Sequence, residues 1–85
     1  MKNSKVTVYT MDYCPFCEQA KTLLKKRGVE FQEVRVAMDD DNQWETLYKR
    51  TGLRTMPQIF HGEEVIGGYT DLAALDQKQG LEHLK

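Results

Sequence analysis

Both cysteines of this 85-residue chain lie in one short motif, Cys14-Pro15-Phe16-Cys17. The segment before the motif, Val6 to Tyr9, is rich in residues that favour strands, and Glu18 to Arg27 has the pattern of a helix. Side chains three positions apart at the start of a helix lie on one face, close enough to be joined by a disulfide. The motif therefore predicts a strand-to-helix junction that carries two thiols.

A cysteine pair at such a junction is typical of a thioredoxin-type redox centre. The first backbone N–H groups of a helix lack intrahelical partners and the helix dipole is positive there, so a thiolate at Cys14 is stabilised and its pKa is lowered. Cys17 is expected one turn deeper, and Pro15 suits the first helical position because its missing N–H would be unpaired there. We therefore expect Cys14 to attack and Cys17 to resolve.

Two other interpretations of the cysteine pair are weaker. A structural zinc site normally has four ligands, and the other soft candidates, His61 and His83, are distant in sequence from the motif. A purely structural disulfide over so short a loop would remove little entropy from the unfolded chain. The sequence therefore predicts a redox pair and no metal site.

The composition is that of one small globular domain spanning residues 1–85. A formal net charge of −1 argues against a nucleic-acid-binding protein, and the basic cluster Lys25 to Arg27 falls at an expected helix end, where cations complement the dipole. Met1 to Lys5 lead into an apolar run too short for a signal-peptide core or a membrane span. We expect a cytoplasmic monomer that binds neither nucleic acid nor membrane.

The rest of the chain alternates between strand and helix patterns. We expect a helix over Pro15–Arg27 ended by Gly28, then a strand over Phe31–Val36, then a helix from a cap in Asp39–Asp41 to Thr51. A hairpin of Gln58–Phe60 and Glu63–Ile66 follows, with its turn at His61-Gly62. A helix capped by Thr70 and ended by Gly80 comes next, and a closing turn over Leu81–Leu84 ends the series. Trp44 shares an amphipathic stripe with Leu47 and is expected in the core.

This order, β-α-β-α-β-β-α, predicts an α/β fold with a four-stranded mixed sheet flanked by three or more helices. The first β-α-β segment should form a right-handed parallel unit. The hairpin would then add two antiparallel strands to the same sheet. In this arrangement the cysteine motif lies at the carboxyl end of the first strand.

Three sequence blocks together resemble the glutaredoxins, specifically the short dithiol glutaredoxins of bacteria. The blocks are Tyr9-Thr10 with Tyr13 to Cys17, then Thr55 to Phe60, then Ile66 to Leu72. The resemblance covers nearly the whole chain and implies a thioredoxin-like fold. It also implies a glutathione-dependent thiol–disulfide oxidoreductase that reduces protein disulfides and protein–glutathione mixed disulfides. Glutathione would be the reducing cosubstrate, with no bound cofactor.

The resemblance further implies which residues contact glutathione. Thr55-Met56-Pro57 looks like the family's cis-proline loop, in which the backbone of Met56 would pair with the cysteine of glutathione. Gly68-Tyr69-Thr70-Asp71 looks like the binder of the γ-glutamyl end, where helix N–H groups meet the α-carboxylate and Asp71 meets the α-ammonium. Tyr13, directly before the cysteine motif, and Phe16, within it, are expected to line the same site.

The chain departs from the family pattern at two positions. Met11 stands where many relatives carry a lysine that helps to stabilise the thiolate and holds the glycine carboxylate of glutathione. Phe16 replaces a tyrosine that is frequent within the motif. Arg54 fits a second family position for that carboxylate, and a guanidinium can bind it with two hydrogen bonds. We therefore expect Arg54 to be the main remaining cationic contact.

Two alternative functions stay open from the sequence. A disulfide reductase driven by thioredoxin reductase would use the same thiols, although Tyr13 stands where thioredoxins carry a tryptophan. An iron–sulfur cluster carrier would bridge two chains through Cys14 and glutathione. Pro15 argues against the carrier, because relatives that bind clusters usually have a smaller residue there.

Overall fold

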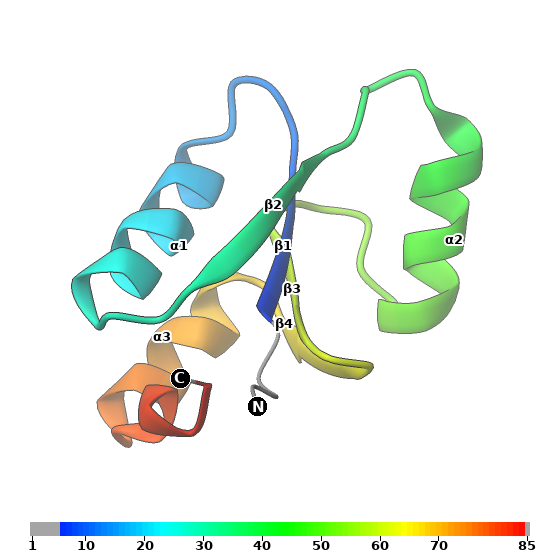
Figure 1. Cartoon of the computed structure of the whole chain (residues 1–85). Helices are drawn as coiled ribbons and strands as arrows, with labels where there is room; N and C mark the ends of the chain where they lie inside the picture. The colour runs from blue at the N-terminus through cyan, green and yellow to red at the C-terminus, as the bar shows by residue number, and fades with distance from the viewer. Residues whose placement is uncertain (1–5, 85) are drawn as a thin grey trace.

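The computed structural model describes residues 6–84, so Met1–Lys5, on which the expectation for the N-terminus rests, lie outside it together with Lys85. The elements follow the predicted order, and the expected closing turn is the short helix η1 (Figure 1). Their bounds are β1 Val6–Thr10, α1 Pro15–Lys26, β2 Phe31–Arg35, α2 Asp41–Thr51, β3 Gln58–His61, β4 Glu64–Gly67, α3 Tyr69–Gln77 and η1 Gly80–Leu84.

The four strands form one mixed sheet in the order β2-β1-β3-β4. β1 and β2 are parallel, with Val6 opposite Phe31 and Thr10 opposite Arg35, which confirms the predicted β-α-β unit. β3 runs antiparallel to both β1 and β4. The central strand β1 therefore ends between two neighbours, and its carboxyl end leads into the cysteine motif.

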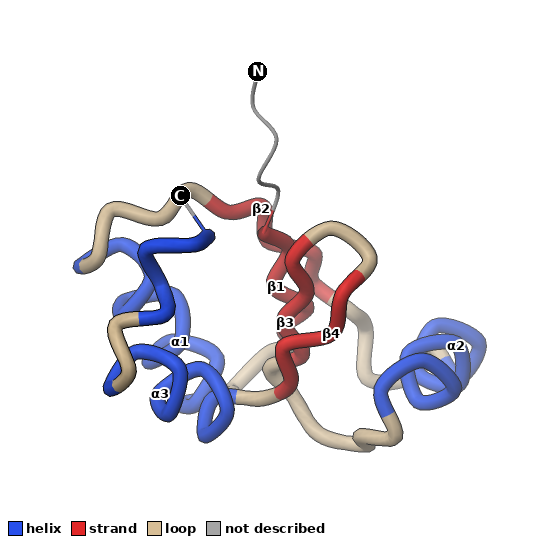
Figure 2. The backbone as a smooth tube through the Cα atoms, turned by 90° about the horizontal axis from the view of Figure 1, so that it is seen from below, coloured by secondary structure: helices blue, strands red, loops and turns tan. Residues whose placement is uncertain are grey.

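Helices cover both faces of the sheet, with α1 and α3 on one side and α2 on the other (Figure 2). One apolar cluster joins the sheet to α1 and α3, and it consists of Val6, Val8, Ala20, Leu24, Val29, Ile59, Leu72, Leu81 and Leu84. A second cluster reaches α2 and consists of Cys14, Cys17, Val36, Leu47, Met56 and Phe60. The two cysteines are therefore part of the packed interior, where burial of each large apolar side chain contributes about 1.5–3 kcal/mol.

The start of α2 follows the predicted capping chemistry. Asp40 caps α2, because its Oδ1 accepts a hydrogen bond of 3.2 Å from the backbone N–H of Gln43. Gly52 ends α2 in the left-handed region at φ 76°.

Trp44 is half-buried at the edge of the second cluster, and its indole N–H donates to the Ala37 carbonyl at 3.0 Å, so this side chain lies at the rim of the core.

The start of α3 differs from the prediction that Thr70 caps the helix. The helix begins at Tyr69 with Gly68 as the N-cap, so Thr70 lies within the first turn. The Asp71 side chain reaches back to this N-cap, because its Oδ2 accepts a hydrogen bond of 3.0 Å from the Gly68 backbone N–H. Gly67 at φ 120° turns the chain here, and a Cβ on Gly67 would collide with the Asp71 carboxylate.

Other boundaries also differ from the sequence-based expectation. α1 ends at Lys26 instead of Arg27, and β2 ends at Arg35 instead of Val36. The hairpin turn lies at Gly62-Glu63, because His61 still pairs with Glu64 in the ladder. α3 ends at Gln77, and Gly80 begins η1 rather than ending α3. The shift of the hairpin turn follows from strand pairing, which local residue preferences do not encode.

A polar network connects α1 to β2 next to the first cluster. The Lys21 ammonium lies 3.0 Å from Glu33 Oε2 and 3.1 Å from Glu18 Oε2. The hydroxyl of buried Thr10 donates to the same Glu33 oxygen at 2.8 Å. The Thr10 hydrogen bond, helped by Lys21, lowers the pKa of Glu33 despite its partial burial. The bond to Glu33 in turn raises the pKa of Lys21.

We predict that Asp40→Ala lowers the free energy of unfolding by about 1 kcal/mol, because the first turn of α2 loses its side-chain acceptor. Urea unfolding followed by circular dichroism measures the change. Asp39→Ala, one exposed residue earlier, is the matched control. Equal losses in the two variants would contradict the assignment of the cap to Asp40.

We predict that Glu33→Gln lowers the free energy of unfolding near neutral pH. The variant should also lose less of that free energy than the wild type when the pH falls. A carboxyl whose pKa is lower in the folded state stabilises the fold above the pKa of the unfolded chain, 4.5 for this carboxyl, and that stabilisation disappears as the pH falls through the folded-state pKa. Urea midpoints measured from about pH 7 down to about pH 3 test this. Glu63→Gln, which replaces an exposed carboxyl in the hairpin turn by the same amide, is the matched control.

Candidate redox site

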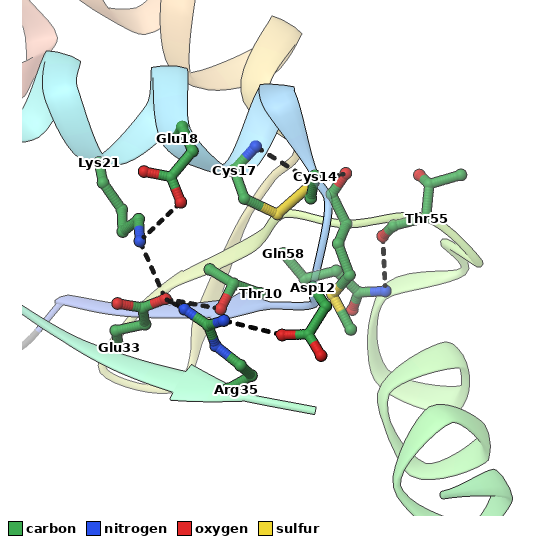
Figure 3. The surroundings of a disulfide bond; sticks show 11 residues. Thr10, Asp12, Cys14, Cys17, Glu18, Lys21, Glu33, Arg35, Thr55 and Gln58 are labelled. Carbon is green, nitrogen blue, oxygen red and sulfur yellow. Dashed lines mark hydrogen bonds and ion pairs between the residues drawn. A yellow bond between two sulfur atoms is a disulfide. The ribbon is translucent and has the colours of Figure 1, made fainter. Parts of the chain in front are cut away.

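Cys14 and Cys17 are joined by a disulfide at the start of α1, with their Cα atoms 5.2 Å apart (Figure 3). Cys14 is the N-cap of the helix and has an extended backbone, at φ −119° and ψ 96°. Its Sγ accepts a hydrogen bond of 3.2 Å from the backbone N–H of Cys17. Pro15 occupies the first helical position, as its missing N–H predicts. The motif therefore lies at the strand-to-helix junction where the sequence places it.

The two sulfur atoms differ in accessibility and in surroundings. Cys14 is 7% exposed and Cys17 is 1% exposed, so an incoming group reaches Cys14 first. Once the disulfide is opened, the Cys17 N–H and the positive end of α1 favour a thiolate on Cys14. Cys14 Sγ also lies 3.6 Å from the Met56 carbonyl oxygen, which brings the loop before β3 against the nucleophile.

The loop before β3 has a cis peptide bond between Met56 and Pro57, as the resemblance implies. Both residues are buried, whereas Thr55 is exposed. The loop lies alongside the cysteine pair because β3 pairs directly with β1. Antiparallel pairing places the start of β3 beside the end of β1, from which the chain continues to Cys14.

Gln58 holds this loop in place, a role that the sequence analysis did not assign. Its side chain is fully buried, and its Nε2 donates to the carbonyls of Leu53 at 3.0 Å and Thr55 at 3.1 Å. Its Oε1 accepts from the Thr51 hydroxyl at 3.0 Å. The sequence signal for this role is an amide side chain directly before the apolar pair Ile59-Phe60. A buried amide there needs several hydrogen-bond partners, so it can connect neighbouring segments.

A groove of about 330 Å³ runs beside the cysteine motif. Its walls come from the start of α1, the loop before β3 and the start of α3, and they consist of Phe16, Leu53, Thr55, Met56, Pro57, Gly68, Tyr69, Thr70 and Asp71. Phe16 stacks on Tyr69 across the groove, with ring centroids 6.0 Å apart and planes 27° from parallel. The fold therefore gathers most of the predicted site residues, which lie far apart in sequence, into one concavity.

The end of the groove at α3 is polar. The first N–H groups of this helix lie there, beside the carboxylate of Asp71. Asp71 is exposed although it accepts from the Gly68 N–H, so its carboxylate keeps capacity for a further donor. Backbone donors and a carboxylate at one end suit a small molecule that carries both an anionic and a cationic group.

Two predicted residues, Tyr13 and Arg54, are not among those that line the groove. Tyr13 is 96% exposed. The guanidinium of exposed Arg54 lies 3.9 Å from the ring centroid of Tyr48, a cation–π contact at the loop that leads to Thr55. Met11 is half-buried and packs against the cluster that contains the cysteines.

Charged side chains lie on the other side of the disulfide (Figure 3). Arg35 donates to Asp12 at 2.8 Å and to Glu33 at 3.3 Å, so the β2 network continues to the turn before Cys14. The hydrogen bond to Asp12 is the main cause that raises the pKa of Arg35. Within residues 6–84, no group of three or more His, Cys, Asp and Glu is placed to hold a metal ion. None of the helices described is long and apolar enough to cross a membrane.

Comparison with known proteins agrees with this geometry. Residues 6–66 match the family model of the glutaredoxins. The chain is 45% identical over 83 residues to glutaredoxin 3 of Escherichia coli strain K12, and the aligned region covers 95% of this chain and 96% of the relative. It is 40% identical over 82 residues to a probable glutaredoxin of Synechocystis, which covers 96% and 93%.

Solved glutaredoxin structures have the same fold. A buckwheat glutaredoxin–glutathione complex superposes with a TM-score of 0.86 at 26% identity, covering 95% of this chain and 76% of the other. A glutaredoxin from Brucella melitensis superposes with a TM-score of 0.82 at 38% identity, covering 94% and 86%. The thioredoxin-like architecture, the cysteine pair at a helix N-cap and the matched sequence together show that this chain belongs to the glutaredoxin family and is a thiol–disulfide oxidoreductase.

Proposed function

We propose that glutathione is the reductant of this protein and that its substrates are protein disulfides and protein–glutathione mixed disulfides. The observation that carries the proposal is the groove beside Cys14, which joins the Met56 backbone to the polar start of α3. A relative of the same fold is described as a complex with glutathione. Glutathione is a tripeptide with two carboxylates, one ammonium and a thiol, so it matches a groove with a reactive sulfur at its side.

With a mixed disulfide, the Cys14 thiolate attacks the glutathione sulfur. The bond between that sulfur and the protein breaks, and the protein leaves as a thiolate that takes up a proton. A second glutathione thiolate then attacks the sulfur held on Cys14. This attack releases glutathione disulfide and restores the Cys14 thiolate, so one protein–glutathione mixed disulfide and one glutathione thiol give one protein thiol and one glutathione disulfide.

With a protein disulfide, the Cys14 thiolate forms a mixed disulfide with one protein sulfur and releases the other as a thiolate. The Cys17 thiolate attacks Cys14 Sγ, frees the second protein thiol and closes the disulfide seen in the structure. Two glutathione molecules then open this disulfide in succession and leave as glutathione disulfide. Glutaredoxins as a class have potentials of about −200 to −230 mV, close to that of cytosolic glutathione, so glutathione can drive the cycle.

The groove offers partners for the cysteine and the γ-glutamyl portions of glutathione. The backbone of Met56, together with Thr55 and Pro57, would hold the cysteine portion next to Cys14. Gly68 to Asp71 would bind the γ-glutamyl end through the first N–H groups of α3 and the Asp71 carboxylate. The stacked pair of Phe16 and Tyr69 would form the apolar wall between these ends. Arg54 stays a predicted contact at the rim.

We also propose that the protein acts as a monomer in the cytoplasm. The groove and both cysteines belong to one chain, so a single copy contains all the groups that this mechanism uses. A compartment rich in reduced glutathione is required for turnover, and the cytoplasm is such a compartment.

We predict that Cys14→Ser abolishes activity on every substrate, because it removes the attacking sulfur. Cys17→Ser should keep most activity on glutathione mixed disulfides, where glutathione resolves the adduct, and lose reduction of protein disulfides. Glutathione-coupled assays on the mixed disulfide of glutathione with 2-mercaptoethanol and on insulin measure the two activities. Equal loss of mixed-disulfide activity in both variants would overturn the assigned roles.

We predict that Arg54→Ala raises the KM for glutathione mixed disulfides about tenfold, because a hydrogen bond to a charged group is worth about 1.5–3 kcal/mol. Adding Met11→Lys to Arg54→Ala should partly restore the KM, because the new ammonium would bind the same glycine carboxylate of glutathione.

Arg50→Ala is the matched control for Arg54. Arg50 is also an exposed arginine stacked on a ring, 4.5 Å from the centroid of Phe60, and it is not among the groove-lining residues. Its replacement should leave the KM near that of the wild type. A KM for Arg54→Ala that matches Arg50→Ala would show that Arg54 only packs on Tyr48.

A further inference from the structure

Tyr13 has a backbone conformation that its side chain disfavours. Its φ is 58°, in the left-handed region, which a bulky residue with a Cβ rarely adopts. In the part of the chain that the structure describes, Gln79 is the other non-glycine residue with a positive φ. Glycine or asparagine would suit this turn better than tyrosine. The residue type at position 13 is therefore not explained by the needs of the turn.

Packing does not explain Tyr13 either, because 96% of the residue is exposed. An aromatic ring contributes to stability mainly by burying its large apolar surface, and this ring buries almost none within the fold. It is also the most exposed of the large hydrophobic residues described, ahead of Met38 at 65% and Phe16 at 57%. The ring thus remains available to a partner outside the chain.

The residues on both sides of Tyr13 are held in place, and this fixes the backbone from which the ring projects. Asp12 is paired with Arg35 at 2.8 Å, and Arg35 also contacts Glu33 on β2. Cys14 is held by the N-cap hydrogen bond and by the disulfide. An unfavourable backbone conformation persists only where neighbouring contacts determine it, and such residues are common at ligand-binding sites.

Tyr13 directly precedes the nucleophile but does not line the groove proposed for glutathione. In thiol–disulfide exchange the attacking, central and leaving sulfur atoms lie roughly in line. When glutathione in the groove carries the central sulfur, the leaving sulfur therefore lies on the far side of it from Cys14. The protein attached to that sulfur must then approach through the solvent around Cys14, where Tyr13 is exposed.

We propose that Tyr13 is a specificity-determining residue that packs its ring against the polypeptide around the cysteine of a protein substrate. This inference rests on the proposed function and adds the substrate class that the site favours: proteins over small disulfides. Aromatic side chains with few rotatable bonds are common anchors in protein–protein contacts, and removal of one anchor often lowers affinity about tenfold or more.

The test compares two substrates that bring the same glutathione sulfur to Cys14 and differ in the leaving thiol. One is glutathionylated serum albumin and the other is the mixed disulfide of glutathione with 2-mercaptoethanol. For each variant the measured quantity is the ratio of kcat/KM on the protein to kcat/KM on the small substrate. Tyr13→Gly and Tyr13→Asn suit the left-handed backbone and remove the ring, so both should lower this ratio about tenfold. Tyr13→Phe should keep the ratio of the wild type.

Gln79→Gly is the matched control, because it replaces the second left-handed residue, which lies between α3 and η1. This variant should keep both activities. The melting temperature of Tyr13→Gly should equal or exceed that of the wild type, because an exposed ring is lost and an unfavourable conformation is relieved.

Three results would overturn the inference. An unchanged ratio in Tyr13→Gly and Tyr13→Asn would show that the ring does not contact protein substrates. An equal fall on both substrates would assign Tyr13 to glutathione or to the reactivity of Cys14. A lowered ratio in Gln79→Gly would show that the effect is not local. Failure of the proposed function is distinguishable from all three, because the wild type would then reduce neither substrate with glutathione.

Discussion

The hydrogen bond from the Cys17 backbone N–H to Cys14 Sγ joins the fold of this protein to its chemistry. Most N-caps provide a side-chain acceptor, and here a sulfur atom takes the place that serine, threonine or aspartate usually fills. Because the acceptor is also the reactive atom, the N–H that begins α1 favours negative charge on that atom when the disulfide opens. The rest of the site depends on this helix start. β1 leads to it, and the pairing of β3 with β1 brings Met56 within 3.6 Å of Cys14.

The cysteine pair belongs to the interior, and this limits what its redox cycle can change. The disulfide links residues three positions apart within one helical turn, so its reduction frees little chain entropy. The cluster around it, which includes Leu47 and Phe60, is held by packing against α2 and the sheet. We therefore expect the oxidised and reduced proteins to share one fold, with the change confined to the first turn of α1.

Sequence patterns were sufficient for the element order, the sheet composition and the place of both cysteines, because these follow from local periodicity, capping and a short motif. They were insufficient where a long-range contact decides. Thr70 has the hydroxyl of a typical N-cap, yet Asp71 reaches the Gly68 N–H and the helix starts earlier. The cation–π contact of Arg54 with Tyr48 joins two side chains that no local pattern associates. The backbone of Tyr13 could not be predicted either, since its residue type disfavours the observed φ.

The buried amide of Gln58 has a consequence for how the groove would bind. One side chain connects the end of α2, through Thr51, to the carbonyls of Leu53 and Thr55, and its own backbone belongs to β3. The groove wall that contains Met56 and Pro57 is therefore rigid before any ligand arrives. Binding to a preorganised wall does not have to immobilise that loop, so the affinity retains free energy that a mobile loop would lose as conformational entropy. A flexible tripeptide ligand would then be the main component that becomes ordered on association.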